Sequence, residues 1–221
     1  MALRCRTGAA QIGLVLVLIG SPSAAFTQPS ADPLAPLNEP SSATELSSQA
    51  AAQIANWVIA TSDNGGSPFI VIDKISAKVL VFNAAGQMMG SSPALLGITR
   101  GDDSAPGIGD RELRNIPLQD RTTPAGRFVA KYGPAAGHSK VLWVDYPSAL
   151  SLHPVVAGTR KERRLQRLNS PAPEDNRITY GCINVPTKFY AKVIRPLFNE
   201  TTGVIYILPE TRSLKDVFRA L

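Results

Sequence analysis

Short apolar segments separated by turn residues make up most of the chain from residue 67 onward. Residues 69–73 and 78–82 are rich in Val and Ile and flank a segment that can turn, which predicts a β-hairpin. Further strands are predicted in segments 88–96, 126–132, 141–146, 149–152 and 203–208. Short strands at this spacing are typical of an antiparallel sheet that folds back on itself. The pattern therefore predicts a mostly β domain over 67–221, with few peripheral helices.

Helical periodicity is confined to three places. An apolar stripe that follows the capping-box spacing of Ser42 and Glu45 predicts an N-terminal helix within 43–66. A second helix is predicted over 187–197, and Ser213 can cap a short terminal helix.

A long loop rich in glycine is predicted over 97–123, and loops of this length in compact domains are often functional. Asp102, Asp103 and Asp110 within it do not have the spacing of a calcium loop, so we interpret them as a solvated face.

The first 42 residues have the pattern of an export signal followed by a linker. Arg4 and Arg6 precede a short apolar run, and small residues up to Ala25 offer a cleavage site, which predicts a signal peptide over 1–25. The apolar run is too short to span a bilayer. Prolines among small polar residues make 26–42 a flexible linker. We therefore expect an exported protein of the periplasm or cell envelope with no integral membrane span.

The charge balance of the mature chain is mildly positive. Removal of Arg4 and Arg6 lowers Lys plus Arg from 23 to 21 against 17 acids, a net charge of +4. This balance suits contact with an anionic envelope polymer and is too weak to favour nucleic acid, for which the chain has no motif.

Cys182 is the one cysteine that remains after the signal is removed, because the other, Cys5, lies within it. A lone thiol in an oxidising compartment is open to oxidation and mispairing, so it is interpreted as retained for its chemistry. The alternative is a buried cysteine that acts as a small hydrophobic residue.

A nucleophilic cysteine needs a base, and the chain offers His153 and His138. His153 ends an apolar strand that can hold its ring firmly, whereas His138 lies among glycines and is interpreted as a surface residue. Gly181 permits unusual dihedrals and a close backbone approach, so the N–H groups around Tyr180, Gly181 and Cys182 are candidates for an oxyanion hole. One cysteine and two histidines are too few for an ordinary zinc site, so no metal is expected.

Three segments together resemble the L,D-transpeptidase catalytic domain of the YkuD type, whose members cross-link bacterial peptidoglycan. They are the hairpin over 69–82, the segment Thr123-Pro124-Ala125-Gly126-Arg127-Phe128, and His153 followed later by Thr179-Tyr180-Gly181-Cys182-Ile183-Asn184. The resemblance covers residues 67–209. It implies a β-sandwich or barrel-like fold with Cys182 as nucleophile and His153 as base. It also implies that the carbonyl of Pro154 orients the imidazole, and that no cofactor is needed.

Two departures from the family pattern concern the site. Tyr180 stands where the family commonly has a histidine, and a phenol is a poor base near neutral pH. The loop after His153 is long and carries a basic run that includes Arg160 and Arg164. The run is typical of a solvated helical turn, or alternatively of a lid whose arginines bind the carboxylates of a stem peptide.

The remaining site residues are assigned by the same resemblance. Asn184 steadies the cysteine turn or contacts substrate, and Thr179 is grouped with the arginines as a substrate contact. The implied reaction is acyl transfer from a peptidoglycan stem peptide through a Cys182 thioester. Two alternatives stay open: an amidase or hydrolase of the same fold, and a binding module with weak catalysis. The sequence does not indicate an oligomeric state.

Overall fold

The computed structural model describes residues 43–135 and 138–221, with only the backbone for 43–48, 138 and 139. The signal peptide over 1–25, the linker over 26–42 and the capping residue Ser42 lie outside the described residues. The strands are β1 (Phe69–Asp73), β2 (Lys78–Phe82), β3 (Met88–Pro93), β4 (Leu96–Gly97), β5 (Gly126–Ala135), β6 (His138–Asp145), β7 (Leu150–Pro154), β8 (Arg177–Thr179), β9 (Ile183–Val185) and β10 (Gly203–Ile207). The α-helices are α1 (Ala43–Thr61), α2 (Arg164–Leu168), α3 (Thr187–Phe189), α4 (Arg195–Phe198) and α5 (Leu214–Val217).

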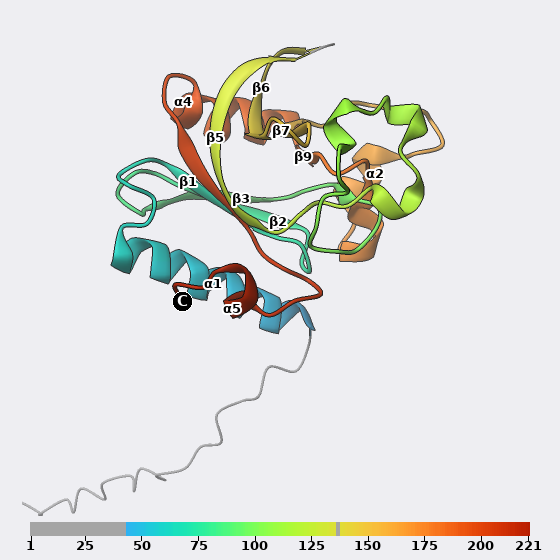
Figure 1. The fold of residues 1–221 in the computed structure, drawn as a ribbon. Coiled ribbons are helices and arrows are strands. Elements are labelled where there is room, and N and C mark those ends of the chain that lie inside the picture. The colour runs from blue at the N-terminus through green and yellow to red at the C-terminus, as the bar shows by residue number, and fades with distance from the viewer. Residues whose placement is uncertain (1–42, 136–137) are drawn as a thin grey trace, which may run out of the picture. The chain divides into compact units, whose positions relative to one another are not determined.

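Eight of the strands form one curved sheet in the order β3-β2-β1-β10-β5-β6-β7-β9 (Figure 1). The expected mostly β fold with few helices is confirmed. The sheet is mixed rather than antiparallel, because β1 pairs with β10 and β7 pairs with β9 in parallel. Parallel neighbours need crossover connections, and the long segments that precede β9 and β10 provide them.

The main core lies between the two halves of this sheet. On β1, Ile70 and Ile72 face it, and on β10 Ile205 and Ile207 face it, which is the alternation of side chains that a pleated strand imposes. Residues from β2, β5, β6, β7 and β9 complete this core, together with apolar side chains from the helical segment 187–198. The core therefore fixes the strands that carry the functional residues.

A second core lies on the opposite face of β1 and β10. Phe69 and Val71 alternate with the residues of the first core and contact α1, whose Ile54 and Val58 are fully buried. Figure 1 shows α1 and α5 together beneath this part of the sheet. The helix begins as predicted but ends at Thr61, and the chain to β1 continues through turns.

The long segment between β4 and β5 consists of 3₁₀ turns at Ile108–Asp110, Leu113–Asn115 and Leu118–Asp120. Figure 1 shows this segment at the same end of the sheet as α2. Another 3₁₀ turn, Pro173–Asn176, follows α2, and the helical segment 187–198 contains a π turn at Tyr190–Ile194. Among the described residues, no helix is both long and apolar enough to cross a bilayer.

Candidate active site

The candidate residues lie where β7 and β9 run side by side. In the parallel register, Leu152 pairs with Ile183 and His153 pairs with Asn184. Leu152 and Ile183 point into the main core, so the alternating residues on each strand point away from it. Ser151, His153, Cys182 and Asn184 therefore share one face, with Ser151 beside the sulfur.

A turn before β9 holds Cys182, and two buried threonines fix its geometry. The Thr179 hydroxyl donates to the carbonyl of Cys182 at 2.7 Å and accepts the N–H of Gly181 at 3.1 Å. The Thr123 hydroxyl donates to the carbonyl of Gly181 at 2.7 Å and accepts the N–H of Gly97 at 2.8 Å. Gly181 has φ 132°, and a Cβ there would lie 2.8 Å from the carbonyl oxygen of Thr122, so the turn requires glycine.

The same bonding bears on the expected oxyanion hole. The N–H of Gly181 is used within the turn by Thr179. Across the described residues, the N–H groups of Tyr180 and Cys182 make no hydrogen bond. These two amides, rather than that of Gly181, are the backbone donors that a ligand beside the sulfur can use.

Cys182 is half-buried and lines a cavity of about 60 Å³. Its sulfur lies 3.5 Å from the hydroxyl oxygen of Ser151 and 3.6 Å from the carbonyl oxygen of Ala149. Much of the cavity wall comes from the 3₁₀ segment, through Ile108, Leu113 and Ile116 among others. The long loop predicted over 97–123 therefore forms part of the wall of the cavity at the sulfur.

His153 is held in one orientation by hydrogen bonds to both ring nitrogens. Its Nδ1 lies 2.8 Å from the carbonyl oxygen of Pro154, the contact that the family resemblance implied. Its Nε2 lies 3.0 Å from Nδ2 of Asn184. Burial lowers the pKa of His153, the hydrogen bond to Pro154 opposes this, and the positive charge of Arg164 lowers the pKa further. The net direction is downward, which favours a neutral imidazole at neutral pH.

Tyr180, which replaces the commoner family histidine, lines the cavity beside Cys182. The guanidinium carbon of Arg121 lies 4.0 Å from the centre of its ring, a cation–π arrangement. The phenol therefore joins the wall of the cavity to the end of the 3₁₀ segment. Sequence reasoning did not single out Arg121. The one feature of the sequence that could have pointed to it is its position just before Thr122 and Thr123, at the start of the motif segment.

A buried ionic network lies beneath the cysteine turn. Lys74 is fully buried, and its ammonium donates to Asp102 at 2.7 Å and to the carbonyl of Thr123 at 2.9 Å. Arg177 and Glu210 form a second buried ion pair at 2.5 Å. The network joins β8, the start of the long loop and the C-terminal segment, so it braces Thr123 and through it Gly181.

The interpretation of Asp102 as part of a solvated face is wrong. Its side chain is 1% exposed and accepts hydrogen bonds from Lys74, the Thr211 hydroxyl and three backbone amides. Burial by itself would raise the pKa of this carboxyl, but the hydrogen bonds from Lys74, Thr211 and Glu210 outweigh burial and hold the pKa well below its usual range. Asp103 and Asp110 are exposed, as expected.

The residues assigned to substrate binding lie in three different settings. Thr179 is 3% exposed and its hydroxyl is used within the cysteine turn, so its position is that of a structural residue. Arg160 is exposed on the loop after β7. Arg164 is turned inward, with a side chain 12% exposed that pairs with Glu162 and reaches Asn184. The basic run is therefore only partly a solvated face.

Ser151 lies beside the sulfur, and His138 lies on β6. Ser151, which contacts the sulfur, was missed by sequence reasoning, although its position two residues before His153 on one strand was a usable signal. The backbone of His138 begins β6 opposite Ala135. Within the described residues, no group of three or more His, Cys, Asp or Glu side chains is placed to hold a metal ion.

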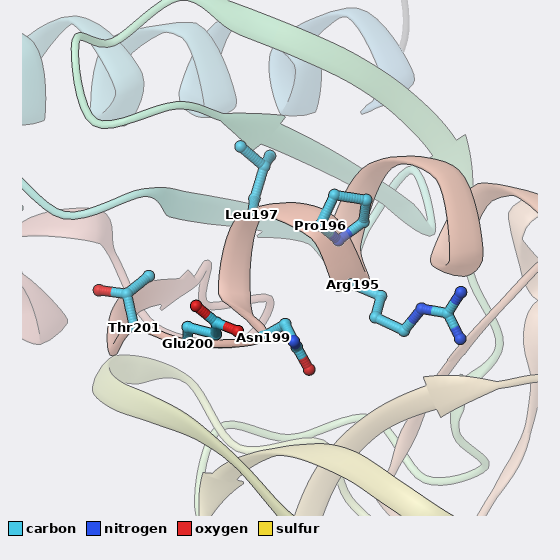
Figure 2. A pocket seen from close by; sticks show the side chains of 6 residues that line it. All are labelled: Arg195, Pro196, Leu197, Asn199, Glu200 and Thr201. Carbon is cyan, nitrogen blue, oxygen red and sulfur yellow. The ribbon is translucent and has the colours of Figure 1, made fainter.

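A larger hollow of about 660 Å³ lies elsewhere, around the end of α4 (Figure 2). It is lined by Arg195, Pro196, Leu197, Asn199, Glu200 and Thr201. In Figure 2 the side chain of Arg195 points away from Glu200 and Thr201, so the charged groups do not converge on one point. The cavity at Cys182, although smaller, brings a thiol together with backbone N–H groups that make no hydrogen bond within the described residues.

No protein-family model matches the chain, and no curated protein matches it. The solved structures that match part of the chain include L,D-transpeptidases. One is the NMR structure of the catalytic domain of the E. faecium L,D-transpeptidase, with a TM-score of 0.37, 12% identity, and coverage of 65% of this chain and 98% of that one.

Another solved structure is that of the LD transpeptidase LdtMt1 in complex with imipenem, with a TM-score of 0.37 and 15% identity. The match covers 64% of this chain and 59% of that chain. Both matches are partial and have low identity.

Proposed function

We propose that this chain is an exported cysteine acyltransferase that acts on peptidoglycan stem peptides, in the manner of an L,D-transpeptidase. The observation that carries the proposal is the arrangement on one face of β7 and β9. There, Cys182 lines a cavity, His153 stands diagonally across from it, and the N–H groups of Tyr180 and Cys182 are not used within the fold. Residues placed diagonally on neighbouring strands have Cβ atoms about 7–8 Å apart, a gap that an imidazole and a thiol can bridge together.

In the proposed reaction, Nε2 of His153 acts as a general base. The hydrogen bond that Nε2 accepts from Asn184 gives way to the Cys182 thiol, and Nε2 takes the thiol proton while the sulfur attacks the carbonyl carbon of the donor amide. The oxyanion takes hydrogen bonds from the two backbone amides, each worth about 3 kcal/mol of transition-state stabilisation. The amide C–N bond breaks, the leaving amine takes the proton from the imidazolium, and a thioester remains.

An acceptor amine then attacks the thioester, gives its proton to Nε2 and leaves Cys182 as a thiol. The depressed pKa of His153 supports the base role, because a neutral ring is the form that accepts a proton.

Hydrolysis is the second candidate, because the cavity at Cys182 is narrow, about 60 Å³, and water is the smallest acceptor. With water as acceptor, the same thioester gives a free carboxylate, and the protein is an amidase or cross-link hydrolase.

Imipenem is a suitable probe because the related LdtMt1 was solved with it. We expect the mature protein to gain the mass of one imipenem, with the adduct mapped to Cys182 by peptide mass spectrometry. Cys182→Ala should show no adduct while its circular dichroism spectrum stays unchanged. An unmodified wild-type protein, or equal labelling of Cys182→Ala, would contradict the proposal and leave the binding-module alternative. Products from purified muropeptides, with and without added acceptor amine, distinguish transfer from hydrolysis.

A further inference from the structure

The loop after β7 inserts an arginine into the shell around the candidate base. Nη1 of Arg164 donates to Oδ1 of Asn184 at 3.3 Å, and Nδ2 of Asn184 lies 3.0 Å from Nε2 of His153. Asn184 is 1% exposed and Arg164 is 12% exposed along its side chain. The three side chains therefore form a chain of hydrogen bonds that is largely shielded from water.

The direction of these bonds follows from the chemistry of the guanidinium. Arginine has N–H donors and no acceptor, so the atom of Asn184 that faces Arg164 must be the amide oxygen. The amide nitrogen then faces His153, and it can only donate. Nε2 of His153 must accept this hydrogen bond, so the proton of the neutral ring is on Nδ1, which donates to the carbonyl of Pro154 at 2.8 Å.

We propose that Arg164 is a positioning residue that acts through Asn184 to hold His153 in the tautomer with the proton on Nδ1 and the lone pair on Nε2. The inference rests on the proposed function, in which Nε2 is the basic nitrogen. Without Arg164, the Asn184 amide is free to turn and offer its oxygen. That oxygen stabilises a proton on Nε2, and the ring then cannot accept the proton of the thiol.

Glu162 and Gly158 support the placement of Arg164. Glu162 forms an ion pair with Nε of Arg164 at the base of the loop. Gly158 has φ 62°, and a Cβ there would collide with the Glu162 carboxylate and lie 2.8 Å from Nε of Arg164. The backbone at Gly158 therefore leaves room for the ion pair, which is the arrangement expected if the loop is built to present this guanidinium.

The role proposed for Arg164 differs from a direct contact with a substrate carboxylate, which the basic run suggested. A substrate contact changes the binding of a carboxylate ligand at every pH. A positioning role changes the proton distribution on His153 even without a ligand, because the Asn184 amide and the nearby positive charge both act against a proton on Nε2. The two roles are separable by spectroscopy on the ligand-free protein.

The experiment is a ¹H–¹⁵N correlation of the imidazole nitrogens in the mature protein. A His138→Gln background leaves one histidine, because the chain has two. We expect the wild-type pattern to be that of a protonated Nδ1. In Arg164→Gln, the pattern should shift towards a protonated Nε2, and the titration midpoint of His153 should rise by about 0.5–1 pH unit.

Two further variants make the test specific. Arg163→Gln removes the same charge from a neighbouring exposed arginine, whose side chain bonds to Gln166 and, within the described residues, to no other group, and it should leave the midpoint unchanged. Gly158→Ala keeps the charge of Arg164 but displaces its side chain, and it should reproduce the shift seen in Arg164→Gln.

The pH dependence of imipenem acylation provides the functional readout. In Arg164→Gln, the acid limb of the rate profile should move upward with the midpoint measured by NMR. An unchanged tautomer and midpoint in Arg164→Gln would overturn the inference. A uniform fall in acylation at every pH without a shift of the midpoint would also overturn it and would indicate a contact with the ligand carboxylate. Failure of imipenem to acylate the wild type contradicts the proposed function instead, since the NMR comparison needs no activity.

Discussion

The hydroxyl of Thr123 provides a sharp test of how the cysteine turn is held. Thr123 is fully buried, and its Oγ1 donates to the carbonyl of Gly181 at 2.7 Å and accepts the N–H of Gly97 at 2.8 Å. Thr123→Val keeps the shape of the side chain but removes both hydrogen bonds. Gly97 and Gly181 are themselves buried, so water does not replace the lost partner.

The expected loss of stability follows from two buried polar groups left unpaired. Each such group costs about 1–3 kcal/mol, so the free energy of unfolding should fall by about 2–6 kcal/mol. A domain of this size loses about 2–4 °C of melting temperature per kcal/mol, which predicts a fall of about 4–24 °C. The protein should remain folded, because a typical domain is stable by about 5–15 kcal/mol.

Urea unfolding monitored by tryptophan fluorescence gives the free energy of unfolding. The dependence of that free energy on urea concentration reports whether the folded state is as compact as in the wild type. Thr123→Ser restores the hydroxyl and should recover most of the loss. The rate of imipenem acylation by folded Thr123→Val should also fall, because Gly181 and the Cys182 amide are then less firmly held. A change below about 0.5 kcal/mol, or equal destabilisation by Ser and Val, would refute the reasoning.

Two further predictions concern the support of the same turn. Asp102→Asn leaves the buried ammonium of Lys74 poorly paired and should lower the free energy of unfolding by about 3–5 kcal/mol at pH 7. Because the folded-state pKa of Asp102 is depressed, its contribution is fully present above the unfolded value of about 3.9 and is lost as pH falls through the folded value. Urea titrations between pH 7 and 2 should therefore show the wild type losing its advantage over Asp102→Asn below about pH 4, and a constant difference would contradict this. Gly181→Ala places a methyl against the Thr122 carbonyl at a φ of 132°, so both the melting temperature and imipenem acylation should fall, and an unchanged melting temperature would show that the turn tolerates a side chain.

The sequence predicted most of the longer strands from short apolar segments between turn residues, but it did not predict β8 and β9, which have three residues each. On β1, every side chain is buried, since Phe69 and Val71 face one core while Ile70 and Ile72 face the other. The capping residue Ser213 was predicted equally well, and its capping box with Asp216 is present at α5. These signals are local, so a single segment contains all the information needed to predict its own secondary structure.

Whether a charged residue is buried or exposed could not be predicted in the same way. Asp102 lies in a glycine-containing loop and has the sequence surroundings of a solvated acid, yet it is paired with Lys74, which is distant along the chain. Arg164 lies in a basic run, yet it is turned towards Asn184. A charge is buried only where a distant partner compensates its desolvation, and the partner is not visible in the local pattern.

The candidate residues could be singled out from the sequence: a cysteine after a glycine, a histidine at the end of an apolar strand, and the motif segments that resemble one family. The tertiary structure alone decided how they meet. The parallel register of β7 and β9 sets His153 beside Asn184, and the loop after β7 adds Arg164 to that pair. The apolar pattern that makes a segment a strand lies within that segment. Its partner strand and its register depend instead on contacts between segments far apart in the chain.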